Sequence, residues 1–288
     1  MRVSSIDAGY NPASLNSGRA EPIVVFADIL GFADLVLDLE PRVGLIDYAY
    51  YSATGIEKLH EELGGRTEDP LTSAFVCFHR LLDLHIETLM RSDPIESVVF
   101  SDAAYVAFRD PGIASEFAVR LMRDLIRFGV PARMGVSTGT FRAVRLATDV
   151  AEGLRRHSSQ FLGTGVVRAY RAESCGLKGM RIFVHPDAQL TENYPGELVS
   201  VAASAGYADR RIKVERELNY LHPHPPWIPQ ADGAKRPSDY GSLCAAVTQM
   251  GRHAPNAAQI HYAETLAALG RMDGIAIPDG WSDAPETN

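Results

Sequence analysis

Two aspartates stand where predicted strands end, and together they could bind a metal ion. Asp28 closes the apolar run "IVVFAD", and Asp102 lies in the tight turn of "ESVVFSDAAYVAF". If strands 23–28 and 97–101 are neighbours, both carboxylates emerge at the same edge of the sheet, where two like charges are stable together only around a cation. Mg²⁺-type ions bind one or two carboxylates together with substrate phosphates. The pair therefore predicts a divalent-metal site for a phosphorylated substrate.

The segment "DILGF" supplies the other groups that such a site needs. The carbonyl of Ile29 could join the metal ligands. The backbone N–H groups of Leu30, Gly31 and Phe32 open a predicted helix, where a phosphate can approach closely. Each aspartate alone has a simpler interpretation, as a helix N-cap or as an ordinary turn residue. Their joint occurrence in a β-α-β-β order favours the metal site.

The elements that must position these groups follow from the pattern of apolar residues. The predicted strands are 22–28, 97–101, 104–108, 132–141 and 181–185, and 210–218 could form an edge strand. The predicted helices are 33–39, 42–63, 71–91, 113–128, 161–176 and 239–270. This order predicts an α+β fold, with a mixed central sheet and helices on one face.

Composition and charge exclude several classes of protein. The net charge of −8 disfavours a DNA- or RNA-binding surface. The three cysteines have neither zinc nor disulfide spacing, which suits a reducing cytoplasm. No apolar stretch reaches membrane-spanning length, so we expect no membrane association. His222 and His224 resemble a metal pair only superficially, because they lie in the Pro-rich loop 222–237, which cannot form regular structure.

Four segments in the same order resemble the class III nucleotide cyclase catalytic domain. They are "VVFADILGFADLV", "VVFSDAAYVAF", "ARMGVSTGTF" and "GTGVVRAYRAES". The resemblance covers residues 22–187 and departs at Ser101, where the family usually has glycine. It implies a ferredoxin-like cyclase fold over 22–195, preceded by a flexible leader at 1–21. Residues 196–288 would form a C-terminal extension.

The resemblance also implies roles for individual residues. Asp28 and Asp102, with the Ile29 carbonyl, would hold two divalent cations, Mn²⁺ or Mg²⁺. Arg171 would be the transition-state arginine, with its alternative interpretation an exposed arginine on the helix surface. Val167 stands where the family has asparagine, and the adjacent Arg168 would take the arginine's role if the register were shifted. The family implies a homodimer with active sites at the subunit interface.

The base-recognition positions depart from both purine cyclase patterns. They fall on about Glu96 and Gln160, and only the glutamate fits the guanylate pattern. The chain looks closest to the Pycsar pyrimidine cyclases, short enzymes whose cyclic nucleotide acts on a separate effector protein in antiphage defence. This resemblance implies UTP as substrate and cyclic UMP as product, with CTP and cyclic CMP as the alternative. Tyr50 is our candidate base contact, although ordinary helix packing also accounts for the tyrosines at 48, 50 and 51.

Two rival interpretations come from other classes. A cyclase-like protein that binds nucleotide without turnover is favoured by Val167. A diguanylate cyclase or a polymerase palm would use a similar sheet. The diguanylate cyclase is disfavoured by the lack of a Gly-Gly-Asp/Glu-Glu-Phe turn. The polymerase palm is disfavoured by the acidic net charge.

Overall fold

The structure is a computed structural model, and it describes residues 21–32, 70–90, 95–151, 154–188, 198–201, 212–221 and 239–273. Within these ranges, the side chains of 70–73, 144–151 and 154–160 are not described. The predicted leader, the predicted helices at 33–39 and 42–63 and the two histidines of the Pro-rich loop lie outside the described residues.

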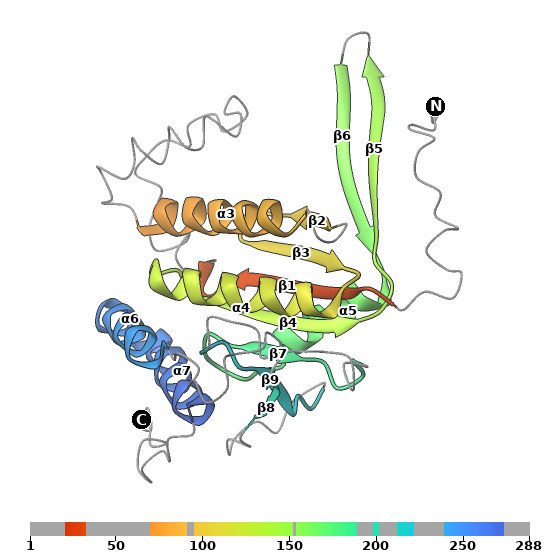
Figure 1. The fold of residues 1–288 in the computed structure, drawn as a ribbon. Helices are drawn as coiled ribbons and strands as arrows, with labels where there is room; N and C mark the ends of the chain where they lie inside the picture. The colour runs from red at the N-terminus through yellow and green to blue at the C-terminus, as the bar shows by residue number, and fades with distance from the viewer. Residues whose placement is uncertain are drawn as a thin grey trace.

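A seven-stranded mixed sheet organises the described part of the chain (Figure 1). Its order is β2-β3-β1-β4-β7-β9-β8. The strands are β1 (Ile23–Ile29), β2 (Glu96–Val99), β3 (Ala103–Phe108), β4 (Ala132–Thr138), β7 (Ile182–Val184), β8 (Leu198–Ser200) and β9 (Arg216–Leu218). The β4–β7 pair is parallel and the other pairs are antiparallel. The predicted α+β class with a mixed sheet is therefore confirmed.

Strand β1 lies between β3 and β4 and is apolar on both faces. Val25 belongs to the core cluster shared with α3 (Pro70–Leu89) and α4 (Pro111–Arg127), whereas Val24 and Phe26 belong to a second cluster on the opposite face. Both valines are fully buried. This burial on two sides explains the unbroken apolar run in the sequence, because a strand covered on one face only would alternate.

Helices cover both faces of the sheet, which corrects the prediction of helices on one face. Helices α3 and α4 pack on the first face, together with α6 (Tyr240–His253). Helix α5 (Thr164–Glu173) packs on the opposite face and lies directly against β4. Gly135 permits this approach, because a Cβ there would stand 2.0 Å from the carbonyl oxygen of Ala169.

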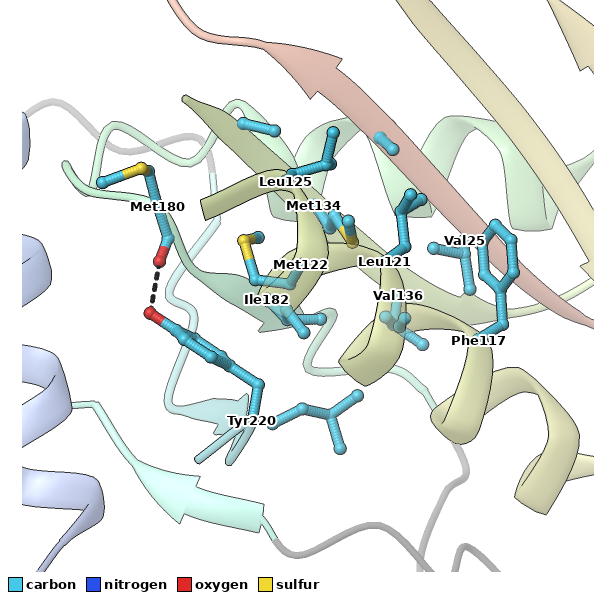
Figure 2. Packing of buried hydrophobic residues seen from close by; sticks show 14 of the residues in the cluster. Val25, Phe117, Leu121, Met122, Leu125, Met134, Val136, Met180, Ile182 and Tyr220 are labelled. Atoms are coloured by element: carbon cyan, nitrogen blue, oxygen red, sulfur yellow. Dashed lines mark hydrogen bonds between the residues drawn. The ribbon is translucent and has the colours of Figure 1, made fainter. Parts of the chain in front are cut away.

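The main core lies between the sheet and α4, as Figure 2 shows. Phe117, Leu121 and Leu125 recur along one side of α4 and are fully buried against β1, β4 and β7. Asp110 caps the helix by accepting hydrogen bonds from the N–H groups of Gly112 and Ile113. The apolar pattern predicted an amphipathic helix at 113–128, whereas the Asp110 cap was not predicted.

The C-terminal part of the chain differs from the prediction in two ways. Strand β9 lies inside the sheet between β7 and β8, so it is not an edge strand. The predicted helix at 239–270 is two helices, α6 and α7 (Gln259–Met272), separated by the short helix η3 (Asn256–Ala258). Pro255 precedes η3 and lacks the N–H that a continuous helix would need.

A second sheet was not predicted. Strands β5 (Arg142–Ala151) and β6 (Leu154–Leu162) pair antiparallel as a long hairpin that projects beyond the main sheet (Figure 1). At its base, Ala143 and Phe161 pack against the second core cluster. Among the described helices, none is both long and apolar enough to cross a membrane.

Candidate active site

Asp28 and Asp102 lie at one edge of the sheet. Asp28 is near the end of β1 and pairs in register with Ala103, the first residue of β3. Asp102 directly precedes Ala103 in the turn between β2 and β3, and its carbonyl accepts a hydrogen bond from the Ile29 N–H at 2.9 Å. The strand beside β1 is therefore β3 and not the expected 97–101, and Asp102 reaches this edge through the turn. The charge of Asp102 acts on the Asp28 carboxylate, so the structure brings the two aspartates close together.

The turn that carries Asp102 is held from two sides. The Ser101 hydroxyl donates to Asp102 Oδ1 at 2.9 Å. His79, on α3, donates from Nε2 to the Ser101 carbonyl at 3.0 Å. Ser101 was noted only as a departure from the family glycine, yet its hydroxyl orients the carboxylate that we expect to bind metal. The position of Asp102 thus depends on a helix distant in sequence.

Asp28 faces the side of the sheet that α5 covers. Its alternate neighbours on β1 show this, because Phe26 belongs to the cluster on the α5 face and Ala27 to the cluster beneath α4. On the same face, Arg133 of β4 is opposite Asp28 in register. Arg133 Nε donates to Glu173 Oε1 at 2.6 Å, which places a third carboxylate near the aspartates.

The carboxylate of Asp28 is costly to ionise in this position. Burial raises the pKa of Asp28 to about 7, and the negative charges of Glu173 and Asp102 add to the rise, whereas Arg133 opposes it. Burial also raises the pKa of Glu173, although Arg133 lowers it in part. A bound cation would reverse this balance, because it favours the ionised form of a neighbouring carboxylate.

The donor set fits a divalent cation that shares its ligands with a substrate. Within the described ranges, no group of three or more His, Cys, Asp or Glu side chains could hold a metal by itself. Two adjacent carboxylates and the Ile29 carbonyl match a Mg²⁺- or Mn²⁺-type ion, which keeps open positions for phosphate oxygens and water. Asp28 and Asp102 are the residues that would hold it.

The predicted phosphate-binding amides are only partly available. The Leu30 N–H donates to the Pro131 carbonyl at 2.9 Å, so this amide is used within the fold. Gly31 has a positive φ of 71°, which a side chain at this position would strain, and Phe32 begins the next helical turn. The predicted contacts are thus reduced to the amides of Gly31 and Phe32.

Arg171 lies on α5 but is not directed at Asp28 of the same chain. Glu173 faces the sheet and is 3% exposed. Arg171 lies two residues earlier, which is about 200° around the helix, and its side chain is exposed on the side away from the sheet. Val167 is 49% exposed. Arg168 donates to the Thr138 carbonyl at 3.1 Å, so its guanidinium is engaged within the chain.

Of the predicted base-recognition side chains, that of Glu96 lies in the described part of the structure. Tyr50 lies outside the described residues, as does the side chain of Gln160, whose backbone pairs with Val144 in the projecting hairpin. Glu96 begins β2 and pairs with Ala107.

An aromatic row, which the sequence analysis missed, lies on the α5 face beside the aspartates. Phe26 stacks on Tyr105 with ring centroids 4.4 Å apart, Tyr105 lies 5.0 Å from Phe161, and Phe161 lies 5.2 Å from Phe100. Tyr170 of α5 lies edge-on to Phe26, with ring centroids 5.8 Å apart. The alternation of Phe26 with Asp28 on one strand face was the available signal for this row.

Arg133 and Glu173 were also missed as a pair. Each lies inside a motif that was used for another residue: Arg133 in "ARMGVSTGTF" and Glu173 in "GTGVVRAYRAES". Their separation in sequence concealed their contact, which depends on α5 crossing β4 at Gly135.

Searches against known proteins give likeness to solved structures only. No family model and no curated protein matches the chain. A bacterial light-regulated adenylyl cyclase has a TM-score of 0.45 and 12% identity, covering 80% of this chain and 98% of that one. The guanylyl cyclase Cya2 has a TM-score of 0.41 and 14% identity, covering 70% and 93%. An adenylate cyclase from Trypanosoma brucei has a TM-score of 0.42 and 14% identity, covering 71% and 92%. At these values the function must be judged from the site itself.

Proposed function

We propose that the protein is a nucleotide cyclase that converts a nucleoside triphosphate into its 3′,5′-cyclic monophosphate and pyrophosphate. The observation that carries the proposal is the meeting of Asp28 and Asp102 at one edge of the sheet, next to the "DILGF" turn. In the reaction, the 3′-oxygen forms a bond to the α-phosphorus, the bond from that phosphorus to the β-phosphate oxygen breaks, and the hydroxyl proton passes to solvent.

The residues divide the work between binding and charge stabilisation. Asp28, Asp102 and the Ile29 carbonyl would hold two divalent cations, Mn²⁺ or Mg²⁺. When bound, such ions lower the pKa of the attacking hydroxyl and neutralise the leaving phosphates. The amides of Gly31 and Phe32 would bind the triphosphate, and Arg171 would stabilise charge on the α-phosphoryl group.

The proposed active sites form between two subunits of a homodimer. The outward direction of Arg171 supports this, because the arginine cannot serve Asp28 of its own chain from that side of α5. Exposed apolar side chains near it support an interface as well: Val167 is 49% and Tyr170 is 51% exposed on α5, and Phe100 is 39% exposed. One subunit would supply the aspartates and its partner the arginine.

For the substrate we propose UTP, with cyclic UMP as the product and CTP as the alternative. Support comes from the replaced purine-reading positions at Glu96 and Gln160 and from the aromatic row, whose Phe100 and Phe161 offer a stacking surface for a small base. Tyr50 is a further proposed base contact. The product would act on a separate effector protein in antiphage defence, and the enzyme would work in the cytoplasm.

A nucleotide-binding protein without turnover is the second candidate. The exposed Val167 favours it, because this side chain cannot make the polar ribose contact that the family's asparagine implies. Measuring binding and turnover on the same preparation separates the two. Retention of triphosphate and Mn²⁺ without cyclic product would favour the second candidate.

The decisive experiment incubates the full chain with each of the four ribonucleoside triphosphates and Mn²⁺, and identifies products by mass spectrometry. We expect cyclic UMP from the wild type and none from Asp28→Ala or Asp102→Ala, with the circular dichroism of both variants unchanged. Mixing Asp28→Ala with Arg171→Ala subunits should restore activity, because half the mixed dimers' sites are intact. A mixture that stays inactive while folded and dimeric contradicts the shared site.

A further inference from the structure

Arg133 lies beside Asp28, yet another carboxylate binds its guanidinium. The two residues are opposite each other in the β1–β4 register and share the α5 face. Arg133 Nε donates to Glu173 Oε1 at 2.6 Å, and Nη2 pairs with the same oxygen. Nη1 donates to the Leu177 carbonyl at 3.0 Å. All three nitrogens are therefore engaged by the end of α5 and the loop after it.

Local stability does not explain a glutamate at position 173. It is the last residue of α5, where the negative end of the helix dipole disfavours a carboxylate. It is also 3% exposed, and a buried carboxylate is unfavourable unless it is paired. The pairing with Arg133 meets that need, so the function of Glu173 is best sought in what it does to Arg133.

Removing the charge of Glu173 would leave Arg133 next to Asp28 with no carboxylate of its own. Cross-strand neighbours of opposite charge attract each other, and an arginine can hold both oxygens of one carboxylate. An ion pair of this kind would use the Asp28 oxygens that the proposed cation needs. The cation would then have to displace a guanidinium before it could bind.

We propose that Glu173 keeps Asp28 available for the cation by binding Arg133. Glu173 and Arg133 are then positioning residues and not metal ligands. This inference rests on the proposed function, since it takes Asp28 as a ligand. Because the charge of Glu173 binds the charge of Arg133, the arginine does not block the metal, although three carboxylates and one arginine lie at this edge.

The test measures Mn²⁺ binding directly. The full chain is titrated with Mn²⁺ alone, and free Mn²⁺ is followed by its paramagnetic resonance signal. Glu173→Gln should weaken binding by roughly 10- to 100-fold, the usual effect of losing a residue that orients a metal ligand. Adding Arg133→Gln to Glu173→Gln should return the affinity to near the wild-type value, because the competing cation is gone. If the pair had a purely structural role, the added Arg133→Gln substitution would not restore the Mn²⁺ affinity.

A second buried pair provides a matched control. Arg181 Nε and Nη2 donate to Glu217 at 2.6 and 2.8 Å, and both side chains are almost fully buried. This pair joins the residue before β7 to β9, and in the sheet order β4 separates β7 from the strand that carries Asp28. Glu217→Gln should therefore lower thermal stability without changing the Mn²⁺ affinity of the folded protein.

The outcomes separate the two proposals. If the wild type takes up no Mn²⁺, or Asp28→Asn binds it equally well, the proposed function fails. If uptake depends on Asp28 but Glu173→Gln binds as the wild type does, or the double variant stays as weak as the single one, only the positioning role is overturned. Should Glu173→Gln not fold, Arg133→Gln alone decides: binding at least as tight as in the wild type supports the competition, and weaker binding refutes it.

Discussion

Replacing Asp28 with asparagine should stabilise the metal-free protein at neutral and higher pH. The pKa of Asp28 is raised from 3.8 to about 7, first by burial and then by Glu173 and Asp102. Between these two pH values, the unfolded chain has released a proton that the folded chain retains. The free energy of unfolding therefore falls as pH rises from 3.8 to about 7, and stays lower above that range. Asparagine carries no such charge and avoids the loss.

The size of the effect follows from the same pKa. A rise from 3.8 to about 7 corresponds to about 4 kcal/mol at 1.36 kcal/mol per pH unit. Asp28 is partly exposed, and solvent screening reduces the value to about 2 kcal/mol. For a domain of this size, 2 kcal/mol raises the melting temperature by about 4 to 8 °C. We expect this gain for Asp28→Asn at pH 8, and almost none at pH 4.

The assay is thermal unfolding in a chelator at pH 4, 6 and 8, followed by circular dichroism. Asp187→Asn is the control, since this side chain is 66% exposed and its substitution should leave the melting temperature at pH 8 unchanged. Adding Mn²⁺ should stabilise the wild type and not Asp28→Asn. If Asp28→Asn is less stable than the wild type at pH 8, or is stabilised equally at pH 4 and pH 8, then the carboxylate of Asp28 does not have a raised pKa and the reasoning is refuted.

Three further predictions concern the scaffold. Gly135→Ala should destabilise by roughly 3 kcal/mol in urea unfolding, because its Cβ would meet the Ala169 oxygen at 2.0 Å and push α5 from β4. Arg181→Met should lose about 3 kcal/mol in the same assay, because among the described residues the buried Glu217 keeps only its longer 3.6 Å contact with Arg271, and Arg181→Met with Glu217→Leu should recover part of it; no recovery contradicts this reasoning. Burial lowers the pKa of His261 from 6.5 to about 4, so the unfolded chain binds a proton that the folded chain does not, and stability should fall as pH drops from 6.5 towards 4. In calorimetry, His261→Gln should lack that part of the fall.

The strands β1, β2 and β3 and the two aspartates beside them could be predicted because their signals are local. The apolar run before Asp28 and the hairpin around Asp102 each occupy a short window of sequence, and β-branched residues in such windows form strands in most contexts. The α4 helix was predicted for the same reason, from a repeating apolar stripe. Local pattern did not show the β5–β6 hairpin, whose arginines and serines carry little strand signal.

The surroundings of Asp28 could not be predicted, because they depend on contacts between distant segments. Arg133 and Glu173 read as an ordinary strand residue and an ordinary helix residue. They meet only because α5 crosses the face of β4 at a glycine, which puts the last turn of the helix over the first residues of the strand. Burial is the main cause of the raised pKa of Asp28, and the crossing adds the negative charge of Glu173.

The sequence by itself determined which residues could bind a metal and that each would lie at the end of a strand, since residue type and apolar periodicity are properties of the chain. Only the tertiary structure decided that α5 lies on the face opposite α3 and α4, that β9 is an interior strand, and that Glu173 binds the arginine beside Asp28. The physical reason is that strand order, helix placement and the environment of a buried charge are set by packing between segments that are remote in sequence.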